Sequence, residues 1–139
     1  MSRRPNPPSG HPPPLEARLD DGTVLDLREL ATEICRRYRD AYPDEQARYG
    51  DAGVAWCVHD NQHLLNWAVL EARGFGDMRA DVTWLAGVLE AREFPLDRLA
   101  HDLDMAADVV RERVPGAPEA LEDALRAAAR HVRETGSLL

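Results

Sequence analysis

The sequence predicts an all-α protein of five to six helices that follow a proline-rich N-terminal tail. Apolar residues repeat at spacings of three and four along successive segments, which is typical of amphipathic helices. No run alternates between apolar and polar residues for long enough to predict a strand. Proline or glycine separates the helical segments, with the short connections of about 2–8 residues that helical bundles use.

The tail, residues 1–14, contains six of the ten prolines and no apolar residue after Met1. Such a segment buries too little surface to offset the entropy of ordering, so we expect it to be disordered. Residues 15–139 then form one helical domain, which suits the length of the chain. This domain is long enough to bury about two-thirds of its unfolded surface without disulfides or metals.

The first helix is predicted over residues 25–42, after a turn at residues 20–22. Asp26 is a suitable N-cap, and Glu29 stands three residues later, as in a capping box. The stripe expected to face the core consists of Leu27, Leu30, Ile34, Tyr38 and Tyr42. The next segment, 43–50, predicts a single turn or a short helix closed by its glycine.

Four further helices are predicted over residues 51–73, 78–93, 95–114 and 118–135. Asp77 can cap the second of them, and proline suits the first position of the last two. Their expected core stripes include Met78, Val82, Leu85 and Leu89, then Leu99, Leu103, Ala107 and Val110, then Leu121, Leu125, Ala128 and Val132. Trp84 is also expected in the core.

Composition and charge argue against several classes of protein. The formal net charge is −8 and no basic face is visible, so we expect no nucleic-acid partner. The chain has neither an apolar run of about 18 residues nor a signal peptide, so we expect no membrane span. Cys35 and Cys57 are 22 residues apart without a C-x-x-C motif, which predicts two free thiols in a reducing, cytoplasmic compartment.

Helix 51–73 carries two contrasting faces when its residues are placed at about 100° steps. The face expected to meet the core consists of Val54, Val58, Leu65, Val69 and Ala72. The opposite face carries Trp56, His59, His63, Trp67 and Leu70. Solvated helices carry charged residues there, so this second face should be covered by protein, by a partner or by a ligand.

Five successive polar residues, 59–63, span more than one turn of this helix and must interrupt its buried face. Asn61 and Gln62 flank the centre of that face. A buried amide without a partner costs about 1–3 kcal/mol. We therefore expect these amides either in a satisfied hydrogen-bond network or in contact with a polar ligand.

The histidine pair leaves several chemistries open. His59 and His63 could bond to a neighbouring helix, or bind a metal together with His101 and His131. Either of the pair could also be an axial ligand to haem. The sequence contains no P-loop, no dinucleotide-binding glycines and no nucleophile elbow. We expect no enzymatic activity.

Two stretches resemble the photoglobins, a family of globin-fold domains that do not bind haem. They are GDAGVAWCVHDNQHLLNWAVLEARG, residues 50–74, and DVTWLAGVLEAREFPLDRLAHDLDMAADVV, residues 81–110. The resemblance covers most of residues 22–115 and implies a globin-like fold that binds a linear tetrapyrrole, biliverdin. The binding positions that it implies are Trp56, His59, Asn61, His63 and Trp67.

We therefore expect a non-haem, globin-like photosensor that signals through a homodimer or a partner. A partner could be a B12-binding signalling protein, because this chain has no cobalamin motif D-x-H-x-x-G of its own. Cys57 lies away from the Trp and His face and Cys35 is on another helix, so the bilin should be held non-covalently. The competing hypothesis is a ligand-free helical module whose Trp and His face is a dimer interface.

Overall fold

Five α-helices and one short β-hairpin form the structure, a computed structural model that describes Asn6 and residues 8–136. The helices are α1 (Leu27–Ala41), α2 (Asp44–Ala72), α3 (Met78–Ala91), α4 (Leu96–Arg113) and α5 (Glu119–Thr135). The strands are β1 (Glu16–Arg18) and β2 (Val24–Asp26). The predicted all-α class is confirmed.

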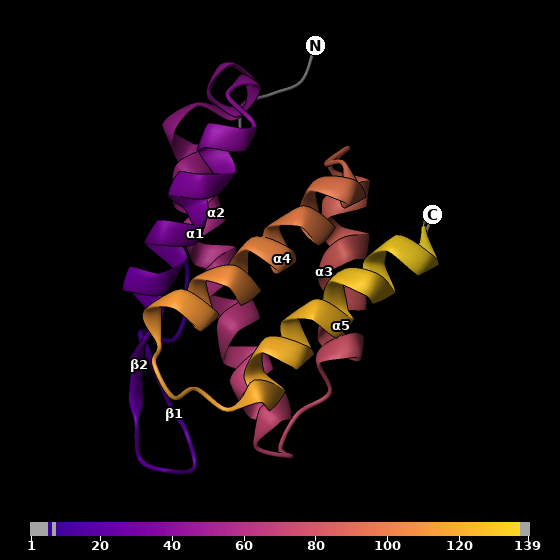
Figure 1. Cartoon of the computed structure of the whole chain (residues 1–139). Helices are drawn as coiled ribbons and strands as arrows, with labels where there is room; N and C mark the ends of the chain where they lie inside the picture. Colours follow the sequence, from indigo (N-terminus) through magenta and orange to yellow (C-terminus); the bar gives the residue numbers. More distant parts are fainter. Residues whose placement is uncertain (1–5, 7, 137–139) are drawn as a thin grey trace.

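The helices pack around one hydrophobic core (Figure 1). α4 and α5 lie side by side as an antiparallel pair, and α3 lies behind them. α1 packs against both α2 and α4, so the first half of the chain contacts the second half. α2 is the longest helix and contacts each of the other four.

The helix starts follow from the residues that precede them. The Asp26 carboxylate accepts a hydrogen bond from the Glu29 amide at 3.0 Å, and Asp77 accepts one from Ala80 at 3.2 Å. Both are N-caps, as predicted. Pro95 and Pro118, which we expected at the first helical positions, occupy instead the cap positions, one residue before α4 and α5 begin.

α2 is interrupted at Gly50, which has φ 66° and ψ −161°. This region of backbone conformation is essentially restricted to glycine. Residues before it form a short helical segment and residues after it the long one, so the two predicted segments, 43–50 and 51–73, are confirmed. The glycine lets α2 change direction without ending.

The β-hairpin corrects the expectation that the chain has no strands. β1 and β2 pair antiparallel, with Ala17 opposite Leu25. The turn between them lies at the predicted residues 20–22, where Gly22 has φ 89°. Each strand has three residues, too few for a period of two to show in the sequence.

The proline-rich segment also differs from the free tail that the sequence predicts. Its described part, Asn6 and residues 8–14, contains no helix or strand, as expected. Two of its backbone carbonyls nevertheless accept hydrogen bonds from side chains of α2. Residues 1–5 and 7 lie outside the described part.

The predicted core stripes are confirmed in most places, with two corrections. On α2, Leu65 and Val69 are buried, but Val54, which we expected to face the core, is 38% exposed and lies about one turn after the change of direction at Gly50. Met78, Val82 and Leu85 of α3 are buried. Trp84, which we expected in the core, is 65% exposed because it lies on the outer side of the same helix. No described helix is long and apolar enough to cross a membrane.

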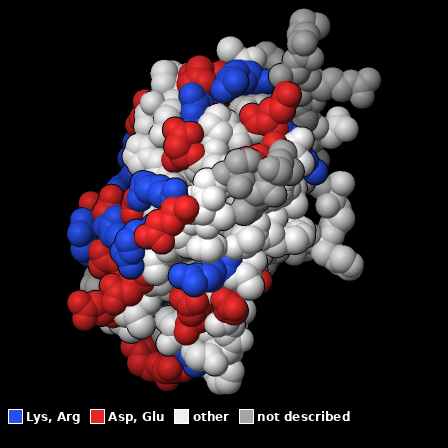
Figure 2. Space-filling view, turned by 90° about the vertical axis from the view of Figure 1, so that its right-hand side faces the viewer, with Lys and Arg blue, Asp and Glu red and all other residues white. Residues whose placement is uncertain are grey.

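Charged side chains gather on one side of the molecule, next to a largely uncharged area (Figure 2). Several ion pairs join α4 to α5. Arg126 contacts Asp108 at 2.6 Å, and Arg133 contacts Asp104 at 2.7 Å. These partly exposed pairs each stabilise the fold only weakly.

Candidate functional site

A cavity of about 510 Å³ lies between α1, α2, α3 and α4. Most of its lining is apolar or aromatic and includes Tyr38, Trp56, Leu64, Leu85, Leu89, Phe94 and Leu99. Its polar groups include Glu45, Asp60, Asn61, Arg92 and Asp102. Small-molecule sites have this size and this composition, mostly apolar with a few placed polar groups.

Asn61 is the centre of the polar part of the cavity. Its side-chain nitrogen lies 3.0 Å from the Cys57 carbonyl oxygen and 3.1 Å from Oδ1 of Asp102. Its side-chain oxygen, Oδ1, is buried and has no hydrogen-bond partner. A buried acceptor without a donor costs about 1–3 kcal/mol, and the residue that carries this one lines the cavity.

Asp102 places a carboxyl group inside the protein beside Asn61. The residue is 5% exposed. Burial raises its pKa from 3.8 to about 7; the Asn61 hydrogen bond opposes the rise, and the charge of Asp60 adds to it. Near neutral pH this carboxyl can therefore either donate or accept a proton.

Glu45, another lining residue of the cavity, belongs to a buried ion pair. Arg98 donates to Glu45 at 2.7 Å and to Asp44 at 3.0 Å, so the buried Glu45 is neutralised. The Tyr38 hydroxyl nearby is buried without a hydrogen bond of normal geometry. Burial also raises the pKa of Tyr38, so this phenol stays neutral.

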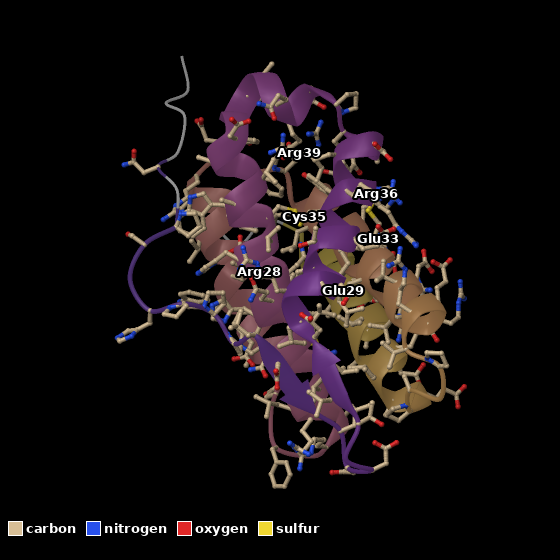
Figure 3. All side chains as sticks on the ribbon, turned by 90° about the vertical axis from the view of Figure 1, so that its left-hand side faces the viewer. Arg28, Glu29, Glu33, Cys35, Arg36 and Arg39 are labelled. Atoms are coloured by element: carbon tan, nitrogen blue, oxygen red, sulfur yellow. A yellow bond between two sulfur atoms is a disulfide. The ribbon has the colours of Figure 1, made fainter. Side chains whose placement is uncertain are left out.

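Cys35 and Cys57 form a disulfide between α1 and α2, which corrects the expectation of two free thiols. Their Cα atoms are 6.0 Å apart, the usual spacing for such a bond. Figure 3 shows the Cys35 sulfur directed from α1 toward the neighbouring helix. Cys57 also lines the cavity.

The Trp and His face predicted on helix 51–73 is present as a row of four rings. Neighbouring ring centres are 5.1 Å apart for Trp56 and His59, 4.9 Å for His59 and His63, and 5.9 Å for His63 and Trp67. All four side chains are half-buried. Asn61 lies on the other side of α2 and is buried, as the interruption of the buried face predicted.

The structure therefore divides the five predicted binding residues between two places. Trp56 and Asn61 line the cavity, whereas His59, His63 and Trp67 are not among its lining residues. Burial lowers the pKa of His63, and the neighbouring His59 lowers it further. His63 is therefore mainly neutral at physiological pH.

The proline-rich segment covers part of this face and of the cavity mouth. The Trp56 indole nitrogen donates to the Asn6 carbonyl, and the Gln62 amide donates to the Pro14 carbonyl at 3.0 Å. Asn6 and Ser9 also line the cavity. The proline-rich segment thus covers part of the Trp and His face, which we expected protein, a partner or a ligand to cover.

The two histidines considered as further metal ligands, His101 and His131, have separate partners. His101 lies 2.6 Å from the Tyr42 hydroxyl, and His131 lies 2.7 Å from the Thr83 hydroxyl. Neither of them completes a site with His59 and His63. Within Asn6 and residues 8–136, no group of three or more His, Cys, Asp or Glu side chains is arranged to hold a metal ion.

Sequence reasoning did not identify Asp102, Glu45 or the disulfide as parts of the site. Asp102 did carry a signal, because it lies between Leu99 and Leu103 in the apolar stripe of helix 95–114. An acidic residue in such a stripe is rarely buried without a specific reason. The cysteine pair carried no comparable signal in its spacing.

Comparison of the chain with protein-family models, with curated proteins and with solved structures finds no match.

Proposed function

We propose that this protein is a small-molecule-binding domain whose ligand occupies the cavity between α1, α2, α3 and α4. Asn61 carries the proposal, because this residue lines a cavity of about 510 Å³ and its buried side-chain oxygen has no hydrogen-bond partner. A ligand that donates a hydrogen bond to this oxygen would remove an unfavourable contribution to the free energy of folding.

The lining indicates what kind of molecule binds. Trp56, Phe94 and the leucines favour a flat, largely apolar ligand. Glu45 is paired with Arg98, so the remaining ionisable lining groups are Arg92, Asp60 and the partly protonated Asp102. The cavity therefore favours a neutral or cationic molecule that carries an N–H or O–H group.

Biliverdin on the row of rings is the second candidate, favoured by the continuous half-buried surface of Trp56, His59, His63 and Trp67. The cavity offers few cationic groups to its two carboxylates. We therefore place biliverdin along α2, where it displaces the proline-rich segment. Light-driven rotation of a pyrrole ring would then alter contacts with His59 and His63 and move that segment.

Either ligand would act through α2, because α2 carries both the cavity wall and the ring row. Its opposite side belongs to the core, so a shift on the ligand side changes packing elsewhere. The exposed Trp84 on α3 provides an apolar contact for a second copy or a signalling partner. No reaction is needed for this role, and we propose a sensor that is not an enzyme.

Calorimetric titration with two probes of opposite charge tests the proposal. Proflavine is a planar cation with two amino groups, and biliverdin is a dianion with four linked pyrrole rings. We expect proflavine to bind the wild type and to bind Asn61→Ala about tenfold to hundredfold more weakly, because about 1–3 kcal/mol is lost. Asn66→Ala, one turn further along the same helix and outside the cavity, is the matched control and should bind normally.

A pair of variants on α3 locates the bound probe. Leu89→Trp fills the cavity and should abolish proflavine binding, whereas Ala91→Trp, exposed on the same helix, should not. His63→Ala should weaken biliverdin alone. Equal proflavine binding by both tryptophan variants would contradict the cavity site, and unchanged biliverdin binding by His63→Ala would contradict the ring-row site.

A further inference from the structure

Only one of the two disulfide cysteines lines the cavity. Cys57 lines the cavity and is half-buried, whereas Cys35 is 2% exposed and belongs to α1 behind it. A molecule inside the cavity can therefore touch the Cys57 sulfur. It reaches Cys35 only through Cys57. In a reactive cysteine pair, this arrangement distinguishes an attacking thiol from a resolving thiol.

Asn61 connects both sulfur atoms to the buried carboxyl. Its side-chain nitrogen lies 3.5 Å from Sγ of Cys57, 3.6 Å from Sγ of Cys35 and 3.1 Å from Oδ1 of Asp102. An amide has two N–H groups, so these acceptors share them. When the disulfide is open, the same amide can donate to a thiolate and stabilise it.

Asp102 supplies the proton chemistry that a thiol reaction needs. Its carboxyl lines the same cavity and is buried among apolar residues, which keeps much of it protonated near neutral pH. The groups facing it include Asn61 on α2 and the charge of Asp60. A buried acid that lines the same cavity as Cys57 can donate a proton to a leaving group there.

We propose that Cys57 and Cys35 are a reversible redox centre that reacts with an organic hydroperoxide whose apolar part occupies the cavity. Cys57 is the attacking thiol, Cys35 the resolving thiol and Asp102 the proton donor. The substrate class rests on the proposed function, because the hydroperoxide must enter the same cavity. The centre would let the protein sense peroxide through the disulfide that joins α1 to α2.

The reaction balances in two steps. The Cys57 thiolate attacks the terminal oxygen of the hydroperoxide, and an S–O bond forms as the O–O bond breaks. The proton of the Cys57 thiol has passed to water before the attack. Asp102 protonates the departing alkoxide to an alcohol, and the proton held by water then restores the Asp102 carboxyl. The Cys35 thiolate next attacks the Cys57 sulfenic acid, and hydroxide leaves with the Cys35 proton as water.

The products are one alcohol, one water molecule and the observed disulfide. The hydroperoxide is reduced by two electrons, and the two thiols are oxidised by two electrons. A dithiol reductant restores the thiols by exchange and is itself converted to a disulfide.

Thiol loss in the 139-residue chain tests the proposal. The protein is reduced with dithiothreitol, freed of reductant without oxygen, and mixed with cumene hydroperoxide or hydrogen peroxide. We expect both thiols to disappear together, about a hundredfold faster than those of N-acetylcysteine at the same pH, as a positioned proton donor allows. Cumene hydroperoxide should react faster than hydrogen peroxide, because its ring occupies the apolar cavity.

Single variants test the two roles. Cys35→Ser should still react and accumulate a Cys57 sulfenic acid that dimedone labels, whereas Cys57→Ser should react no faster than N-acetylcysteine. Asp102→Asn should slow the wild-type reaction by about a hundredfold and remove the fall in rate above about pH 7. Circular dichroism of each reduced sample establishes that the protein compared is folded.

Wild-type thiols that react no faster than N-acetylcysteine would overturn the redox centre, whatever the variants do. Proflavine binding in that same experiment would leave the proposed function standing. Equal rates with both peroxides, together with no proflavine binding, would overturn the substrate class and the proposed function together. Dimedone labelling of Cys35 in Cys57→Ser would overturn the assignment of the attacking thiol.

Discussion

Replacing Asp102 by asparagine should remove a pH dependence of stability that the buried carboxyl gives the wild-type protein. The carboxyl ionises at its ordinary pKa of 3.8 in the unfolded chain and at about 7 in the folded protein. Between these values the folded protein holds a proton that the unfolded chain has released. The free energy of unfolding therefore falls as the pH rises, by up to about 1.4 kcal/mol per pH unit.

The size of the effect follows from the two pKa values. A rise from 3.8 to about 7 corresponds to about 4 kcal/mol that is lost between about pH 4 and about pH 8. An asparagine stays neutral over this range and can accept the same hydrogen bond from Asn61. The variant should therefore gain stability relative to the wild type as the pH rises.

Urea unfolding of the oxidised proteins, followed by circular dichroism at several pH values, measures the difference. Other titrating groups contribute equally to both proteins and cancel in the comparison. Parallel curves for wild type and Asp102→Asn across this pH range would refute the reasoning, because the carboxyl would then ionise alike in the folded and unfolded states.

Three further outcomes can be measured by urea unfolding under the same conditions. Gly50→Ala should destabilise the protein by about 1–3 kcal/mol because of its positive φ, whereas Gly87→Ala, in a helix with open space at its Cβ position, should stabilise it by about 0.5–1 kcal/mol. Leu85→Ala should cost about 2–5 kcal/mol, and Trp84→Ala, exposed beside it, less than about 0.5 kcal/mol. Deletion of residues 1–14 should cost about 1–3 kcal/mol, because a buried α2 amide loses its acceptor. Equal effects within either pair of variants, or an unchanged stability after the deletion, would contradict the structure.

The helices could be predicted because their signals are local. Asp26 and Asp77 cap helices through backbone amides three residues away, and Gly50 marks the change of direction in α2. The hairpin escaped prediction because three-residue strands carry no measurable period. Trp84 was misplaced because tryptophan is usually buried, although its position is about 100° around the helix from Leu85.

The site could be predicted only in part. The faces of α2 are visible in the sequence, whereas the segment that covers Trp56 and the disulfide depend on long-range packing. The faces of α2 follow from helical geometry, which separates His59 and His63 from Asn61. The proline-rich segment contacts Trp56 through the backbone carbonyl of Asn6, and a pattern of side chains cannot predict a backbone contact. The disulfide depends on how α1 and α2 are placed side by side, which a spacing of 22 residues does not determine.

The Asn61 side-chain amide offers the most direct test that a ligand occupies the cavity. Its nuclear magnetic resonance signal can be assigned by its loss in Asn61→Asp and followed while proflavine is added. Asn66, on the same helix but outside the cavity lining, gives an internal control in the same spectrum. We predict that the Asn61 signal shifts in a saturable way and that the Asn66 signal stays in place. A shift of Asn66 alone, or no shift of either amide at saturating probe, would contradict binding at this cavity.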